Sequence, residues 1–266
     1  MKKYFDEFNR DLLQDLKVKL SGELQKTMIN LMYPPVGFLC LELNRALAGF
    51  SKDTNTISEI IISRNSRELV QLNNMYQKMF NKVLVDQISY SRSVSSHYRS
   101  LVTSILTGFR QLENETDPIQ AKQHASLLYW AGEGKRGTDE RLINKVMSYE
   151  SYAQLKIILE EYKKQFGKTL EQSLRKELSG DLLRIHLGIV DYIQSPVAFY
   201  AKQLEYAMRG YGTDDASLIR ILISRSEFDL ENIKREYERR FERTLMSAIQ
   251  ADTAGSYKTA LLAILG

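Results

Sequence analysis

The sequence has few of the residues that build disulfide frameworks and zinc sites. Its 266 residues include 1 cysteine, Cys40, and 3 histidines. A lone cysteine forms no internal disulfide, and this set is too small for a Cys/His zinc site. No run approaches the about 18 consecutive apolar residues of a membrane-spanning helix. The opening segment, Met1–Glu7, also lacks the apolar core of a signal peptide. We therefore expect a soluble cytosolic protein.

An excess of one charge is also missing. The formal net charge is +4, with 43% hydrophobic and 26% charged residues. This composition is globular, and the length suits one large or two ordinary domains. The small positive charge permits contact with anionic surfaces but does not indicate a nucleic-acid partner. We expect no nucleic acid to bind.

Prolines and strand signals are scarce, whereas helical periodicity is strong. The 4 prolines fall between apolar-periodic stretches, so they predict helix boundaries. There are no Asn-Gly or Asp-Gly hairpin turns. Apolar residues recur at i, i+3, i+7 and i+11, which is typical of helices and predicts an all-α fold. These stripes are Leu69, Leu72, Tyr76 and Phe80; Leu155, Ile158, Tyr162 and Phe166; and Leu230, Ile233, Tyr237 and Phe241.

Each stripe ends in a Tyr-x-x-x-Phe segment, and a fourth copy of this segment opens the chain at Tyr4. A glycine follows at the same offset in three copies: Gly22, Gly180 and Gly255. This pattern predicts a Gly-containing turn between two helices. We therefore expect four stacked helical units of about 70 residues. Their expected bounds are 1–34 for repeat I, 35–110 for repeat II, 119–193 for repeat III and 194–266 for repeat IV.

Repeat I is expected to lack its front half, and the polar segment 111–118 is interpreted as a linker. Because stacked units bury their apolar faces against one another, this gap should favour self-association. It should also leave four residues more exposed than Tyr237 and Phe241 of the complete copy: Tyr4, Phe5, Phe8 and Leu12.

Repeats III and IV share a glycine-rich loop before the Tyr-x-x-x-Phe helix. The loops are Gly132–Glu140 and Met208–Asp215. The simpler interpretation is a turn and a helix start, in which threonine caps the first turn and the carboxylates complement the positive helix end.

A remote carboxylate favours a metal site instead. Glu177 follows Thr138 by 39 residues, and Asp252 follows Thr213 by the same 39. Loop carbonyls with one distant carboxylate supply only hard oxygen ligands, which suit calcium rather than zinc.

These residues resemble the annexin family, whose signature is a Gly-x-Gly-Thr loop with an Asp or Glu about forty residues later, within four five-helix repeats. The resemblance spans nearly the whole chain. It implies an annexin-like array whose first repeat is truncated, with Ca²⁺ bound in repeats III and IV. The implied ligands in repeat III are the carbonyls of Gly132, Lys135 and Gly137 with the carboxylate of Glu177. Those in repeat IV are the carbonyls of Met208, Gly210 and Gly212 with the carboxylate of Asp252. Water and a lipid phosphate would complete each shell.

Repeats I and II depart from this signature. In repeat II, Ser51 and Lys52 replace the second glycine and the threonine, and Ser91 stands at the acid position. The Lys52 ammonium should oppose a nearby divalent cation. Repeat I lacks the loop and has Lys19 at the acid position. We expect two competent sites, not four.

The residues at the loop tips have two interpretations. Arg136 and Tyr211 are outermost in their loops, and Arg209 lies two residues before Tyr211. Cations and amphipathic rings are favoured at headgroups and in the interfacial zone, so these three residues are candidate lipid contacts. The alternative is an ordinary solvated loop tip.

The leading hypothesis is calcium-dependent binding to acidic phospholipid membranes, with peripheral association when calcium rises. The alternative is a calcium-independent helical scaffold for cytoskeletal or other protein partners. An enzyme is not expected, because the histidines have no matching nucleophile and acid.

Overall fold

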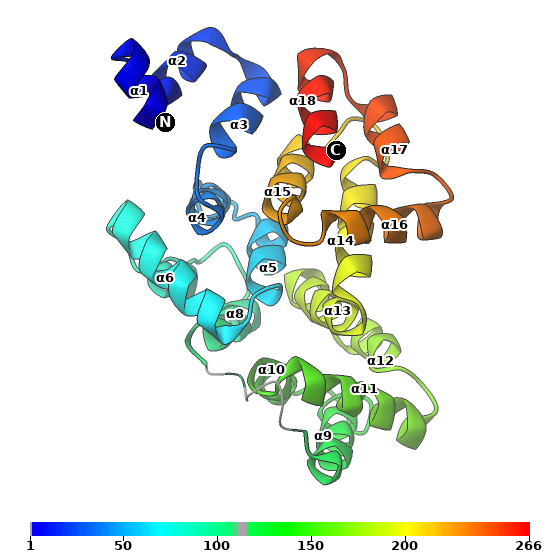
Figure 1. Ribbon diagram of the computed structural model, residues 1–266. Helices are drawn as coiled ribbons and strands as arrows, with labels where there is room; N and C mark the ends of the chain where they lie inside the picture. The colour runs from blue at the N-terminus through cyan, green and yellow to red at the C-terminus, as the bar shows by residue number, and fades with distance from the viewer. Residues whose placement is uncertain (1, 109, 111–115) are drawn as a thin grey trace. The chain divides into compact units, whose positions relative to one another are not determined.

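The computed structural model describes residues 2–108, 110 and 116–266 (Figure 1). These residues form 18 helices, α1–α18, and no strand, so the predicted all-α fold is confirmed. Three helices belong to repeat I: α1 (Lys2–Phe8), α2 (Leu12–Lys19) and α3 (Gly22–Asn30).

Each of the other repeats contains five helices, as expected. Those of repeat II are α4 (Pro35–Ala46), α5 (Thr54–Ile62), α6 (Ser66–Phe80), α7 (Leu84–Ser89) and α8 (Ser96–Thr107). Those of repeat III are α9 (Pro118–Ala131), α10 (Glu140–Tyr149), α11 (Tyr152–Phe166), α12 (Leu170–Glu177) and α13 (Gly180–Gln194). Those of repeat IV are α14 (Pro196–Ala207), α15 (Asp215–Arg225), α16 (Leu230–Phe241), α17 (Leu245–Asp252) and α18 (Gly255–Leu265).

Prolines begin the first helix of three repeats. Pro35, Pro118 and Pro196 are the first residues of α4, α9 and α14. Proline is tolerated there because the N–H that it lacks would have no partner within the helix. The helix boundaries predicted from these prolines are confirmed. Of the predicted linker, residues 111–115 lie outside the described part of the chain.

The predicted glycine turns join α2 to α3, α12 to α13 and α17 to α18. Gly22, Gly180 and Gly255 have φ of +60°, +57° and +61°. Glycine adopts this left-handed backbone without steric cost. Each turn follows directly on a short helix, and two of those helices end at Glu177 and Asp252.

One compact unit consists of Met1–Leu39 and Val197–Gly266. Within it, α18 packs on α3, α15 and α17. Tyr237 of α16 is fully buried, whereas Phe5 and Phe8 of α1 are 56% and 53% exposed. The expected exposure of these two phenylalanines is therefore confirmed, whereas Tyr4 and Leu12 are half-buried, as Phe241 is.

The second unit is Cys40–Pro196, in which α13 packs on α5 and α10 packs on α8. Two hydrogen bonds show that α5 and α13 run parallel. The Thr54 hydroxyl, at the start of α5, donates to Asp181 near the start of α13 at 3.0 Å. At the far ends, the Tyr192 hydroxyl donates to the Ser63 carbonyl at 3.3 Å.

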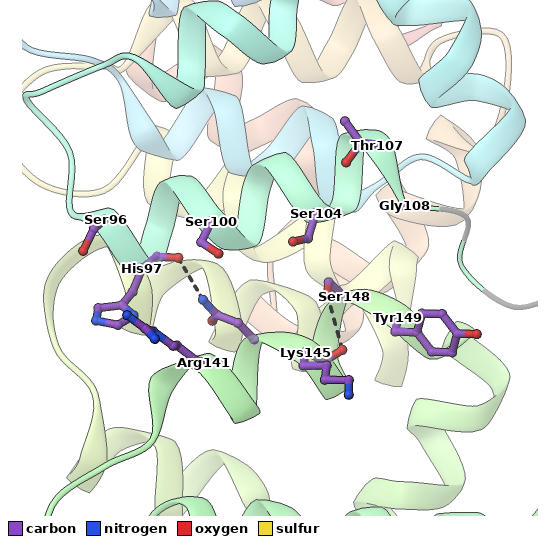
Figure 2. Close-up of a pocket in the computed structure, with 11 residues that line it drawn as sticks. Ser96, His97, Ser100, Ser104, Thr107, Gly108, Arg141, Lys145, Ser148 and Tyr149 are labelled. Carbon is purple, nitrogen blue, oxygen red and sulfur yellow. Dashed lines mark hydrogen bonds between the residues drawn. The ribbon is translucent and has the colours of Figure 1, made fainter.

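The helices α8 and α10 run parallel to each other, since His97 and Arg141, near their starts, lie at one side of the view and Thr107 and Tyr149, at their ends, lie at the other (Figure 2). The Asn144 amide donates to the His97 carbonyl, near the start of α8, at 2.8 Å. The Tyr98 hydroxyl donates to the Thr54 carbonyl at 3.1 Å, which ties the start of α8 to the start of α5. The N-terminal ends of all four helices therefore lie at one end of this unit.

Candidate metal sites

The loop of repeat III connects α9 to α10. The Asp139 N–H donates to the Ala131 carbonyl at 2.6 Å, which closes the loop. Asp139 also caps α10, because its carboxylate accepts from the Leu142 N–H at 3.1 Å. This hydrogen bond holds the pKa of Asp139 below its usual range. The loop does end in a helix start, but Asp139 caps that helix and not Thr138, as the simpler interpretation expected.

The Thr138 side chain instead contacts the remote acid. Its hydroxyl donates to Glu177 Oε2 at 2.6 Å, across 39 residues of sequence. Gly132 faces the same side chain, since a Cβ at this position would lie 3.0 Å from Glu177 Cγ and 3.4 Å from Cδ. A larger residue would crowd the carboxylate. Gly137 has φ of +83°, a conformation that favours glycine. The loop and the acid predicted to pair thus lie together.

Other polar groups of this loop have partners of their own. The Gly132 carbonyl accepts from the Lys135 N–H at 3.3 Å, and a carbonyl oxygen has a second lone pair for an ion. Glu133 forms ion pairs with Lys168 and, at 3.9 Å, Lys176. Sequence analysis missed this cluster, which is spread over three elements.

The loop of repeat IV, between α14 and α15, has the same arrangement. The Thr213 hydroxyl donates to Asp252 Oδ2 at 2.6 Å. Asp214 caps α15 by accepting from the Ser217 N–H at 3.1 Å. Gly210 and Gly212 have φ of +105° and +82°. Two different repeats therefore place a glycine loop against one carboxylate.

The donor atoms at both loops fit calcium. Within the described residues, no three His, Cys, Asp or Glu side chains are grouped so that they could hold a metal. An ion at either loop would depend on main-chain carbonyls, one carboxylate and outside ligands. Calcium accepts such oxygen sets. Glu177 and Asp252 each receive the threonine hydroxyl on one carboxylate oxygen.

The predicted lipid-contact residues lie at the surface. Arg136 and Arg209 are exposed, and Tyr211 is fully exposed. Among the described helices, none is long and apolar enough to cross a membrane.

The loop of repeat II, residues 47–52, is occupied by one of its own side chains. The Lys52 ammonium donates to the carbonyls of Leu47 and Gly49, both at 2.7 Å. Ser51 has no positive φ, unlike the glycine at the equivalent position in repeats III and IV. Ser91, at the acid position, lies 3.3 Å from the Ser93 hydroxyl. Lys52 was expected to repel a cation. Its ammonium in addition binds the loop carbonyls, which the sequence pattern does not indicate.

A groove of about 660 Å³ lies apart from these loops, between α8 and α10 (Figure 2). His97, Arg141 and Lys145 line it together with serine hydroxyls. Beneath it, His186 Nε2 is 2.9 Å from Asn144 Oδ1, and burial lowers the pKa of His186 to about 3.

An all-helical chain in which two glycine loops each face one remote carboxylate is typical of a class of helical repeat proteins. The Annexin family model matches residues 39–105, 123–189 and 199–264. The chain belongs to the annexin family.

Relatives and solved structures agree with this assignment. Annexin B10 of Drosophila melanogaster is 45% identical over 265 residues, which cover 99% of this chain and 82% of the relative. Human annexin A11 is 39% identical, over 97% of this chain and 51% of the relative, so the chain spans about half of that protein. The structure of annexin III has a TM-score of 0.95 at 35% identity, covering 100% of this chain and 82% of that one. A calcium-bound annexin (Sm)1 has a TM-score of 0.85 at 25% identity, with coverage of 100% and 79%.

Annexins are in general calcium-dependent phospholipid-binding proteins, and generally not enzymes.

Proposed function

We propose that this chain binds acidic phospholipid membranes through two calcium ions, one at each pair of loop and acid. In repeat III the ligands are the carbonyls of Gly132, Lys135 and Gly137 with the carboxylate of Glu177. In repeat IV they are the carbonyls of Met208, Gly210 and Gly212 with the carboxylate of Asp252.

The observation that carries this proposal is the hydrogen bond from loop threonine to remote acid. It measures 2.6 Å in both repeats. With a single carboxylate per site, the position of that group relative to the loop carbonyls decides whether they can share one ion. A threonine hydroxyl that fixes the carboxylate acts as an outer-shell partner of the metal.

A site with so little charge binds calcium weakly on its own, near the submillimolar to millimolar end of the known range. A lipid phosphate that joins the shell raises the apparent affinity by linkage. Arg136, Arg209 and Tyr211, exposed at the loop tips, would contact headgroups and the interfacial zone. The protein would then be cytoplasmic at low calcium and peripheral on the membrane when calcium rises.

The repeat bounds 1–34, 35–110, 119–193 and 194–266 remain part of this proposal. In their support, each of the three family matches falls inside one expected repeat.

Sedimentation with phosphatidylserine vesicles tests the two sites. We expect Glu177→Gln/Asp252→Asn to lose calcium-dependent sedimentation while the circular dichroism stays helical. Glu160→Gln/Glu242→Gln is the matched control, because it removes the same charge from two exposed positions. Retained calcium-dependent binding by the first double variant would refute the assignment.

The alternative remains a calcium-independent helical scaffold for cytoskeletal or other protein partners. Wild-type protein that sediments equally in calcium and in EDTA, or not at all, would favour it.

A further inference from the structure

The loop of repeat II contains its own cation at the place where repeat IV would bind calcium. In register, Leu47, Gly49 and Lys52 stand where repeat IV has Met208, Gly210 and Thr213. The Lys52 ammonium lies 2.7 Å from both the Leu47 and the Gly49 carbonyl. Hydrogen bonds from a charged donor are about twice as strong as neutral ones. The ammonium therefore neutralises two carbonyls that, in repeat IV, would face the ion.

The loop so held presents an aromatic ring to solvent. Phe50 is 99% exposed and occupies the position of Tyr211 in repeat IV. An apolar ring at a loop tip contributes nothing to the core and costs free energy in water. The interfacial zone of a bilayer removes that cost, since aromatic rings are enriched there.

The same end of this unit holds the candidate calcium site of repeat III. Thr54, two residues after Lys52, donates its hydroxyl to Asp181 at 3.0 Å. Asp181 follows Glu177 by four residues, across the glycine turn between α12 and α13. A membrane bound at Glu177 would therefore lie at the end of the unit from which the Phe50 loop projects.

We propose that the repeat II loop is a lipid contact that needs no calcium, in which the Lys52 ammonium takes the place of the ion and Phe50 enters the bilayer interface. This inference rests on the proposed function in one respect, namely that the partner is a phospholipid membrane. It differs in assigning a weak, calcium-independent contact to a repeat for which we expect no calcium site.

Single-tryptophan variants test the contact directly. Trp130→Phe removes the 1 native tryptophan, and Phe50→Trp or Tyr211→Trp then places a probe in one loop or the other. With phosphatidylserine–phosphatidylcholine vesicles in calcium, both probes should shift to the blue. In EDTA at low salt and high lipid, only the probe at position 50 should shift. No shift at position 50, or a shift there only in calcium, would overturn the proposal.

Vesicle binding in EDTA measures the same contact by affinity. Phe50→Ala should weaken it about tenfold, as expected for partial loss of one buried ring. Phe228→Ala, at another phenylalanine that is 68% exposed, should leave it unchanged. Equal effects of the two variants would contradict a specific role for Phe50.

Substitutions at Lys52 test whether its ammonium takes the place of the calcium ion. Lys52→Met keeps the aliphatic stem but removes the donors, so binding in EDTA should fall several-fold. Lys52→Arg, which keeps charge and donors, should restore most of it. Failure of Lys52→Met to weaken binding would refute the role of the ammonium.

Glu177→Gln/Asp252→Asn separates the two proposals. This variant should lose calcium-dependent sedimentation and keep the blue shift of a probe at position 50 in EDTA. If wild-type protein shows no calcium-dependent sedimentation but the probe still shifts, the proposed function fails and this inference stands. If calcium-dependent sedimentation is present and the probe never shifts, the reverse holds.

Discussion

The loops of repeats II and IV have the same length and the same closing hydrogen bond. They differ in the contacts made by the residue that precedes the capping aspartate. The Asp53 N–H donates to the Ala46 carbonyl at 2.9 Å, and the Asp214 N–H donates to the Ala207 carbonyl at 2.7 Å. Each aspartate then caps the following helix. The two loops therefore share one frame, although only the loop of repeat IV is paired with a remote acid.

The difference lies in the residue just before the capping aspartate. In repeat IV, Thr213 donates to Asp252 at 2.6 Å and so fixes a remote carboxylate. In repeat II, Lys52 reaches back to its own loop and binds the Leu47 and Gly49 carbonyls. The residue at this one position thus binds two loop carbonyls in repeat II and holds a remote carboxylate in repeat IV.

The largest expected effect comes from transferring this lysine to repeat IV. In Thr213→Lys, the ammonium should bind the carbonyls of Met208 and Gly210, while Asp252 loses its hydroxyl partner. We expect the protein to lose one calcium equivalent in calorimetry and to need more calcium for vesicle binding. Thr259→Lys, at an exposed position of α18, controls for the added charge. Two calcium equivalents of unchanged affinity in Thr213→Lys would show that the lysine does not compete with the ion.

The reverse change should create a site in repeat II. Ser51→Gly/Lys52→Thr/Ser91→Asp supplies the glycine, the threonine and the acid found in repeat IV. Gly212 has φ of +82°, whereas Ser51 has no positive φ, so the glycine is needed to reshape the loop. We expect one additional, weak calcium equivalent in calorimetry. A triple variant that folds and binds no extra calcium would mean that the loop frame alone does not define the site.

A smaller effect should follow from removing only the hydroxyl of repeat IV. Thr213→Val keeps the shape of the side chain but leaves Asp252 without its 2.6 Å partner. Loss of an outer-shell partner typically weakens a metal site about tenfold or more, and we expect about tenfold here. Calorimetry of Thr213→Val in a Glu177→Gln background isolates the repeat IV site. Unchanged affinity would mean that Asp252 is positioned by its helix alone.

Much of this arrangement could be predicted because the same spacings between residues recur in several repeats. The distance of 39 residues from threonine to acid occurs twice, and the Tyr-x-x-x-Phe stripes mark the same helix in each repeat. The apolar periodicity gave the helices, and Tyr76, Tyr162 and Tyr237 are fully buried. Apolar periodicity indicates which residues face a core, so it predicts the structure correctly where packing determines it.

The contacts that the sequence did not predict depend on the direction in which a flexible or polar side chain points. A lysine next to a glycine loop can project into water or fold back onto the carbonyls, and the sequence pattern is the same in both cases. The choice between Thr138 and Asp139 as helix cap is similar, since both residue types cap helices. It was decided by Glu177, which takes the threonine hydroxyl and belongs to another helix.

The smallest expected effect is that of Ser91→Asp alone, which restores the acid of repeat II but leaves its loop unchanged. Lys52 would still hold the Leu47 and Gly49 carbonyls at 2.7 Å, so an incoming ion would have to displace a charged donor. The new carboxylate would also attract the Lys52 ammonium, and this attraction would stabilise the ammonium in the loop and not a calcium ion. We expect calorimetry to give the same number of calcium equivalents as the wild type. An additional equivalent in Ser91→Asp would show that the acid, and not the residue before the capping aspartate, decides between the two kinds of loop.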